Sequence, residues 1–220
     1  MPFGHGKIFA NSQNNSHIES IKVSQLLIAT NNPGKIVEIR HLLAEFNLDF
    51  VTPDELGLHV VVEENGHSYA ENASKKAMAF AEASGLVAVA DDSGLEVDAL
   101  GGKPGLLSNR FGPQPGTDAS RRRFLLEQLN SKPQPWIARF VATVAVSGPG
   151  KAIQISRGEC RGEIIPVERG EGGFGYDPIF LFPELGETMA ELSLVEKNLV
   201  SHRAKAIRNS IASILEYIQN

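Results

Sequence analysis

Short apolar runs alternate along the chain with stretches in which apolar residues recur every three or four positions. Most of the runs are rich in Val, Ile and Ala and carry little charge, which is typical of strands buried in a sheet. They predict strands at residues 25–29, 60–62, 86–90, 137–146, 152–164 and 179–182. The spacing of three or four indicates amphipathic helices at residues 33–46, 68–84, 117–129 and 201–218. Strands interleaved with helices predict an α/β fold.

The stretch from Leu86 to Leu100 is central to this pattern. Its apolar run ends in Asp91 and Asp92, which are followed by the turn-forming pair Ser93-Gly94 and then by renewed alternation. Asp is depleted in strands, so two of them at a strand end are unlikely to serve sheet stability. We therefore expect a strand that presents two carboxylates at its end, where cations and polar substrates bind. An ordinary surface turn explains the same residues equally well.

A second pair of acids follows the strand predicted at residues 60–62. Glu63 and Glu64 precede Asn65-Gly66, which is a turn signal. Two carboxylate pairs at strand ends could converge on one Mg²⁺, because this ion prefers oxygen ligands and keeps some of its water. A solvated turn is the alternative.

The first predicted strand is followed by a loop and a helix start that suit an anion. Asn32 is a good N-cap, Pro33 is a good first helical residue, and Lys35 adds a positive charge. Free backbone N–H groups and the helix dipole would point at a phosphate there. The Walker A spacing is absent, and a plain helix cap is at least as good an explanation.

The glycine-dense segment at residues 168–178 carries two aromatic residues and an Asp. Glycines let the backbone approach a ligand closely, and an aromatic ring held there can stack on a nucleobase. The final helix opens with His202 and Arg203, which oppose the helix dipole and so suggest another task. Asn72 and Lys76 share a helix face, whereas the three arginines at residues 121–123 point around a helix and are interpreted as solvated.

Length, net charge and cysteine content limit the possible domain organisation and the classes of function. The 220 residues fit one domain, expected at residues 25–220, with residues 1–24 as a flexible extension. A net charge of −5 argues against a sequence-independent binder of nucleic acid or of a membrane surface, and no apolar run is long enough to span a bilayer. The single cysteine, Cys160, excludes an internal disulfide and indicates a reducing, cytosolic setting. It is most simply a small apolar filler.

The ordered set of motifs resembles that of the inosine triphosphate pyrophosphatase family, also called the Ham1 or non-canonical purine nucleoside triphosphate pyrophosphatase family. The matching stretches are residues 29–35, 63–66, 71–72, 91–95, 172–180 and 190–192, Lys197, and residues 201–203. The resemblance implies Mg²⁺-dependent hydrolysis of deaminated purine nucleoside triphosphates such as ITP, dITP and XTP to the monophosphate and pyrophosphate. It also implies one two-lobed α/β domain around a long twisted mixed sheet, with flanking helices and a cleft between the lobes. A homodimer in the cytoplasm is expected.

By the family's pattern, Asp92 is the expected general base and, together with Glu63, a metal ligand. The expected contacts to the substrate form a larger set. Its members are Thr30, Asn31, Asn32, Pro33, Gly34, Lys35, Lys76, Ser93, Arg110, Phe174, Gly175, Tyr176, Asp177, Lys197, His202 and Arg203. Among them, His202, Arg203 or the loop backbone would donate to the 6-oxo group of the base.

The chain departs from the family's Ser-Ala-Arg-Tyr motif at Asn109 and Phe111, although Ser108 and Arg110 are kept. The role of this loop therefore stays open. Two other functions fit parts of the pattern. One is a Maf-like nucleotide pyrophosphatase with another base preference, and the other is a nucleotide-binding regulatory module without catalysis.

Overall fold

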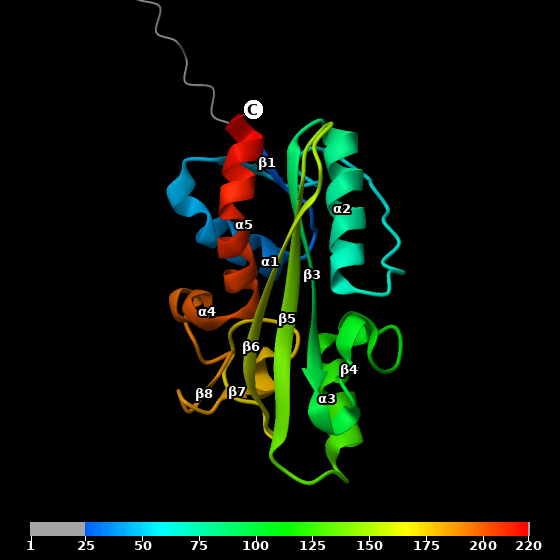
Figure 1. Ribbon diagram of the computed structural model, residues 1–220. Coiled ribbons are helices and arrows are strands. Elements are labelled where there is room, and N and C mark those ends of the chain that lie inside the picture. Colours follow the sequence, from blue (N-terminus) through cyan, green and yellow to red (C-terminus); the bar gives the residue numbers. More distant parts are fainter. Residues whose placement is uncertain (1–24, 220) are drawn as a thin grey trace, which may run out of the picture.

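The computed structural model describes residues 25–219, which form one eight-stranded mixed sheet with helices packed against it (Figure 1). The order along the sheet is β2-β1-β3-β5-β6-β7-β8, and β4 pairs with β3. The strands are β1 (Gln25–Ile28), β2 (Asp49–Val51), β3 (Val87–Val97), β4 (Lys103–Pro104), β5 (Trp136–Ser147), β6 (Gln154–Ile164), β7 (Phe180–Phe182) and β8 (Glu187–Thr188). The helices are α1 (Pro33–Leu42), α2 (Tyr69–Ser84), α3 (Asp118–Leu129), α4 (Leu194–Val200) and α5 (His202–Gln219). The predicted α/β class is confirmed, and the flexible extension predicted at residues 1–24 lies outside the described residues.

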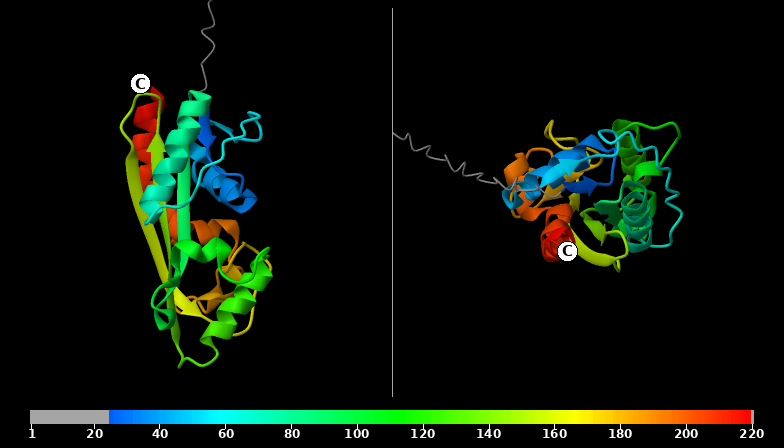
Figure 2. Two further views of the ribbon diagram at one scale, coloured as in Figure 1. Left: turned by 90° about the vertical axis from the view of Figure 1, so that its right-hand side faces the viewer. Right: turned by 90° about the horizontal axis from the view of Figure 1, so that it is seen from above.

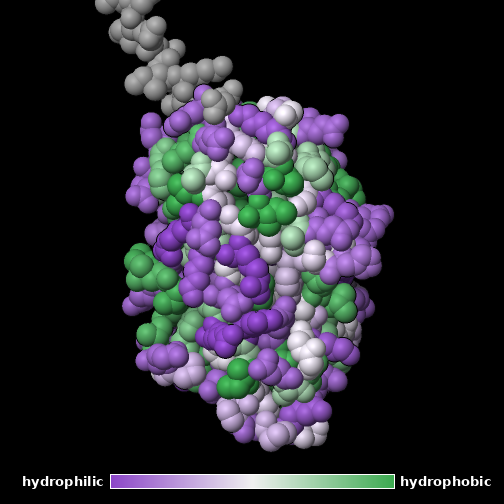
Figure 3. Space-filling model, in the orientation of Figure 1, coloured by the Kyte–Doolittle hydropathy of each residue, from purple (hydrophilic) through white to green (hydrophobic). Residues whose placement is uncertain are grey.

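The long antiparallel strands β3, β5 and β6 run through both halves of the molecule. Strands β1 and β2 extend the upper half in parallel with β3, while β4, β7 and β8 extend the lower half. Figure 2 shows the remaining elements gathered in an upper and a lower group alongside these strands. Hydrophilic residues occupy the middle of the face seen in Figure 3.

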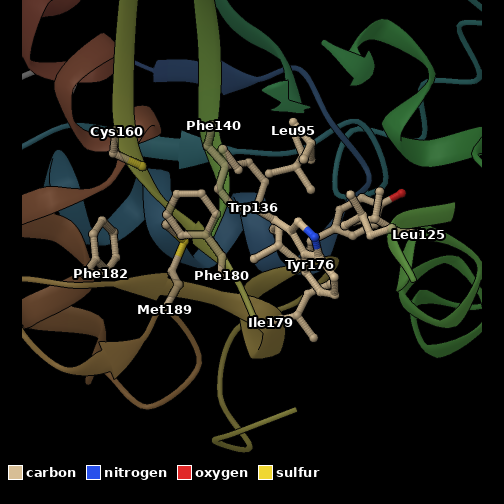
Figure 4. Packing of buried hydrophobic residues seen from close by; sticks show 14 of the residues in the cluster. Leu95, Leu125, Trp136, Phe140, Cys160, Tyr176, Ile179, Phe180, Phe182 and Met189 are labelled. Carbon is tan, nitrogen blue, oxygen red and sulfur yellow. The ribbon is translucent and has the colours of Figure 1, made fainter. Parts of the chain in front are cut away.

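Three hydrophobic clusters hold the helices to the sheet. In the upper half, one cluster joins α1 and α5 to one face, and a second joins α2 to the other. The third fills the lower half, where aromatic side chains such as Phe140, Phe180 and Trp136 pack together (Figure 4). Strands β3 and β5 are buried on both faces in the upper half, which explains their near-continuous apolar runs.

The predicted turn at Ser93-Gly94 is wrong, because β3 continues through Asp91 and Asp92 to Val97. Gly94 is instead a site of close approach: a Cβ there would lie 2.3 Å from the carbonyl oxygen of Gly105. On one edge, β3 pairs with β1 at residues 87–89 and with β4 at residues 96–97. Residues 90–95 lie between these partners and pair only with β5 among the described strands. The acids therefore lie beside a gap in the sheet.

The strand predicted at residues 60–62 is also wrong. Residues 58–66 form an extended loop with no ladder partner among the described strands. Val60 and Val62 pack against the cluster under α2, while Val61 between them is 93% exposed. Alternate residues thus face the core as in a strand, which explains why the pattern was misleading.

The helix predictions are confirmed, with small differences at their ends. Asn32, Ser68, Thr117 and Ser193 cap α1, α2, α3 and α4 by accepting a backbone N–H. Helix α1 ends at Leu42 rather than at residue 46, and a short 3-10 turn follows it. The predicted strand at residues 179–182 begins only at Phe180.

Candidate active site

A cavity of about 320 Å³ opens at the gap in the sheet. Its walls come from both halves: the loop before α1, one face of α2 and residues 92–94 of β3 meet residues 106–110, the start of α3 and the loop at residues 174–177. The first turn of α5 closes it. The cavity thus lies between the upper and the lower elements, as a cleft between two lobes requires.

Two lysines meet at the open edge of β3. Lys76 donates from Nζ to the carbonyl oxygen of Asp91 at 2.7 Å, and Lys35 approaches the same oxygen at 3.4 Å. Lys35 lies in the first turn of α1, where Asn32 accepts its backbone N–H at 3.1 Å. Two cations and a helix N-terminus therefore face one end of the cavity, an arrangement that suits a polyanion.

Asp92 lies beside these lysines. Its carboxylate accepts a hydrogen bond from Asn72 Nδ2 at 2.9 Å, and Lys76 Nζ lies 4.0 Å away. Burial raises the pKa of Asp92 above its usual value, although the charge of Lys76 and the bond from Asn72 oppose that shift. A buried carboxylate with a raised pKa can accept a proton more readily than an exposed one.

Asp91 has a different environment because successive strand residues point to opposite faces of the sheet. Its carboxylate is fully buried and pairs with Lys35 and Arg203, each at 3.0 Å. Burial alone would raise the pKa of Asp91, but these two cations hold it well below its usual range. Asp91 is therefore a permanent anion that holds two cations, whereas Asp92 faces the cavity.

From Arg203, a buried series of ion pairs with alternating charges continues away from Asp91. Arg203 contacts Glu38 at 2.6 Å, Glu38 contacts Lys197 at 2.7 Å, and Lys197 contacts Asp177 at 2.5 Å. Burial lowers the pKa of Lys197, but the carboxylates of Asp177 and Glu38 raise it by more. The Lys197 ammonium therefore stays charged. The chain connects α1, α4, α5 and the glycine-dense loop behind the cavity.

The glycine-dense loop places an aromatic ring against the loop before α1. A Cβ at Gly34 would lie 2.4 Å from the Phe174 ring, so only glycine allows this contact. Lys197 Nζ lies 4.9 Å from the ring centroid, and the Arg203 guanidinium lies 5.5 Å from it. The side chain of Asp177 accepts the backbone N–H of Phe174 at 2.8 Å and so fixes the turn.

Helix α3 holds the same loop from the other side. Asp118 accepts the N–H of Gly175 at 2.7 Å, and Arg122 donates to the carbonyl oxygen of Gly175 at 2.8 Å. Arg122 also pairs with Glu168 at 2.8 Å. The prediction of a solvated face at residues 121–123 is therefore wrong in part: Arg121 lines the cavity, Arg122 is half-buried, and only Arg123 is exposed.

The loop that departs from the family's pattern links the two halves of the site. Ser108 Oγ accepts the N–H of Leu95 at 2.9 Å and so satisfies part of the open edge of β3. Its carbonyl oxygen accepts from the hydroxyl of Tyr176 at 2.9 Å. Arg110 donates across the cavity to the carbonyl oxygen of Glu64 at 3.2 Å.

The structure brings together most of the residues predicted for the site. Asp92 lines the cavity, as do thirteen of the sixteen expected substrate contacts. Those thirteen are Thr30, Asn31, Asn32, Lys35, Lys76, Ser93, Arg110, Phe174, Gly175, Tyr176, Asp177, His202 and Arg203. Pro33, Gly34 and Lys197 do not line it, and Lys197 supports it from behind through Asp177.

The expected metal ligand Glu63 lies outside the cavity. Its exposed carboxylate accepts a hydrogen bond from Asn65 at 3.0 Å and does not line the cavity, whereas the neighbouring Glu64 does. Glu64 pairs with Lys76 at 3.2 Å, so Lys76 contacts both Glu64 and Asp92.

These carboxylates bear on the metal that the resemblance implies. In residues 25–219, no group of three or more His, Cys, Asp or Glu side chains is arranged to hold a metal ion. Mg²⁺ at triphosphate sites is typically held by one or two carboxylates together with substrate phosphates, rather than by protein alone. Asp92 and Glu64, which both line the cavity, therefore fit a Mg²⁺–triphosphate complex, whereas Glu63 lies on the same loop outside the cavity.

Several residues of the site were not among the site residues expected from the sequence, most clearly Glu38, Asn72, Asp118 and Arg121. Two of them had a readable signal. Asn72 lies one turn before Lys76 on the same helix face, and Glu38 is an acid on the buried face of α1 beside Ile39. Nothing in the sequence indicated a role for Asp118 or Arg121 in the site, because their contacts depend on how α3 packs against the glycine-dense loop.

Comparison with known proteins gives consistent results. The sequence model of the Ham1 family matches residues 26–213. The chain is 45% identical over 188 residues to a dITP/XTP pyrophosphatase of Desulforamulus reducens, with 85% of this chain and 94% of that protein covered. It is 41% identical to a dITP/XTP pyrophosphatase of Bacillus subtilis, with 89% and 99% covered.

A solved structure of a HAM1 protein from Coxiella burnetii superposes with a TM-score of 0.78 at 36% identity. The superposition covers 88% of this chain and all of that one. No helix within residues 25–219 combines the length and the hydropathy that crossing a membrane requires.

Proposed function

Since the chain belongs to the Ham1 family, we propose that it hydrolyses non-canonical purine nucleoside triphosphates, such as dITP, ITP and XTP, to the monophosphate and pyrophosphate. One observation carries the proposal: Lys35 and Lys76 meet on the carbonyl of Asp91, one residue from the buried carboxylate of Asp92. A triphosphate needs this concentration of positive charge, and hydrolysis needs the adjacent base.

In this proposal the triphosphate lies against the N-terminus of α1, Lys35 and Lys76. These groups bind the phosphate oxygens and offset their charge, which is the main requirement of phosphoryl transfer. Asp92 accepts a proton from the attacking water, and Asn72 holds its carboxylate in place. Mg²⁺, held by Asp92 and Glu63 with the phosphates, would supply further charge neutralisation.

The base would occupy the other end of the cavity, between the Phe174 ring and the first turn of α5. Hypoxanthine and xanthine carry a 6-oxo group where adenine has an amino group. Donors aimed at that oxygen would face the amino group of adenine, and each mispaired buried group costs about 1–3 kcal/mol. Two such contacts would give a discrimination of roughly a hundredfold or more.

Pyrophosphate release in the presence of Mg²⁺ tests the function directly, with dITP, ITP and XTP compared with ATP, GTP and dTTP. Strong preference for the first three supports the proposal. Preference for a pyrimidine triphosphate would indicate a Maf-like enzyme instead. Tight binding of ITP without release would indicate a regulatory module.

The family resemblance also supports a homodimer in the cytoplasm, which we include in the proposal. The molar mass of the full chain in solution, measured by light scattering, tests the assembly. A mass near twice 23.8 kDa is expected, and a mass near 23.8 kDa at micromolar concentration would exclude the dimer.

A further inference from the structure

The His202 side chain reaches the cavity from the first turn of α5. His202 is 4% exposed, and its ring stacks on Phe140, with the ring centroids 4.7 Å apart and the planes 11° from parallel. Nδ1 lies 3.9 Å from the sulfur of Cys160. No other side-chain hydrogen bond to this ring is found within residues 25–219, so Nε2 is the nitrogen available to a ligand.

The ring is neutral at pH 7. Burial and the neighbouring charges of Arg203 and Lys197 lower the pKa of His202 well below its usual value. A neutral imidazole carries a single N–H, so one ring nitrogen donates and the other accepts. The group that contacts Nδ1 therefore decides what Nε2 offers to a ligand.

Cys160 lies on β6 directly opposite Phe140 on β5, and Figure 4 shows both side chains in the same cluster. The backbone N–H groups of His202 and Phe140 act to lower the pKa of its thiol. The first of these is one of the helix-end donors that α5 cannot satisfy internally. Burial raises the pKa of the Cys160 thiol to about 12, so the proton stays on sulfur.

The protonated thiol is a hydrogen-bond donor, and Nδ1 of His202, 3.9 Å from the sulfur, is the acceptor within reach. Donation to Nδ1 leaves the ring proton on Nε2. Arg203 is less available to donate a hydrogen bond to the base, because its guanidinium already donates to Asp91, Glu38 and Ser93.

We propose that Cys160 is a positioning residue that holds His202 in the tautomer with the proton on Nε2, and that this N–H selects a 6-oxo purine over a 6-amino purine. The selection step rests on the proposed function. In the opposite tautomer Nε2 would accept a hydrogen bond and would favour the amino group of adenine. The base preference thus depends on a thiol that does not line the cavity.

Nitrogen NMR of the full chain labelled with ¹⁵N-histidine tests the tautomer without any substrate. The His202 signals are identified by their loss in His202→Gln. In the wild type we expect a protonated Nε2 and an unprotonated Nδ1. Cys160→Ala should lose this preference, whereas Cys160→Ser, which keeps an O–H donor, should retain it. A wild-type ring protonated on Nδ1 would overturn the proposal.

The ratio of kcat/KM for dITP to that for dATP tests the consequence. Cys160→Ala should lower this ratio by roughly three- to tenfold, the scale of one neutral hydrogen bond, and Cys160→Ser should keep it near the wild-type value. Ile164→Val is the matched control, because it removes one methyl group from the same strand and cluster. It should leave the ratio unchanged.

The two proposals fail differently. A dITP-to-dATP ratio unchanged in Cys160→Ala would overturn the role of Cys160, although pyrophosphate release would continue. Absence of release from dITP, ITP and XTP would overturn the proposed function and with it the selection step. The NMR result would still report the tautomer in that case.

Discussion

Arg203 donates from Nε to the carboxylate of Asp91 at 3.0 Å, although 112 residues separate the two in the chain. The pair joins the first turn of the last helix to the middle of β3, directly behind the cavity. Both side chains are almost fully buried. Because Asp91 also holds Lys35, this contact connects the packing of α5 with the charge that faces the triphosphate.

Replacing Asp91 by Asn should destabilise the fold strongly. Two buried cations, Lys35 and Arg203, would lose their shared counter-ion, and removal of one partner of a buried pair typically costs about 3–5 kcal/mol. Urea unfolding measures this loss. Asp98→Asn, at an exposed position just after the same strand, is the control and should change stability by less than about 0.5 kcal/mol. Equal effects of both changes would contradict the role given to the pair.

Asp92→Asn should affect turnover rather than binding. The amide keeps the shape of the side chain but cannot accept a proton, so kcat should fall by a factor of about a hundred or more. The dissociation constant for dITP, measured by calorimetry in Ca²⁺ to slow turnover, should change far less. Turnover near the wild-type level would remove Asp92 from the role of base.

The adjacent acids Glu63 and Glu64 offer a matched pair for the metal. We expect Glu63→Gln to raise the Mg²⁺ concentration needed for half-maximal activity by about tenfold or more. Glu64→Gln should leave it near the wild-type value, because that carboxylate is already paired with Lys76. Removal of Mg²⁺ by EDTA should abolish activity in every variant. The reverse order of effects would transfer the ligand role to Glu64.

The parts of the site that follow from local motifs were predictable from the sequence. Asn32 and Lys35 belong to one helix start, and the loop containing Phe174 carries its own glycine pattern. Residues whose role depends on packing between distant parts of the chain were not predictable from the sequence. Glu38 has a function only because α4 and α5 bring Lys197 and Arg203 to it.

The wrong strand at residues 60–62 and the wrong turn at Ser93-Gly94 have a common cause. A short apolar run reports burial against a core, and it does not report whether a neighbouring strand is present. Residues 58–66 alternate without a partner, and Asp91 and Asp92 lie inside a strand because the sheet has a gap beside them. The position of that gap depends on where β1 ends and β4 begins, which is a property of the assembled sheet.

Arg122 and Arg123 are consecutive on α3 but differ in environment, which allows another matched comparison. Arg122→Gln should raise KM for dITP by about three- to tenfold with little change in kcat, because the Gly175 peptide would lose its charged donor. Arg123→Gln, at an exposed position, should change neither parameter. If Arg122→Gln lowered only kcat, Arg122 would act on the reacting phosphates and not on the glycine-dense loop.

The buried neutral His202 should make stability depend on pH below about 6.5. The folded-state pKa is lowered, so the unfolded chain binds a proton that the folded protein excludes. The contribution to stability is therefore complete above the unfolded pKa of about 6.5 and is lost as pH falls below it, by about 1.4 kcal/mol per pH unit. The groups facing the ring fit this sign, since Arg203, Lys197 and Lys35 oppose its protonation, whereas Asp91 favours it.

Urea unfolding of the wild type and His202→Gln at pH 7.5 and pH 5.5 isolates this proton. The stability advantage of the wild type over the variant should shrink by about 1.4 kcal/mol between the two pH values. His59→Gln, at an exposed position, is the control and should show a much smaller change. A constant difference between wild type and His202→Gln would mean that the folded protein accepts the proton. The imidazole would then take up a proton in the cavity as pH falls through about 6.5, and 6-oxo selection would not rest on a ring that stays neutral.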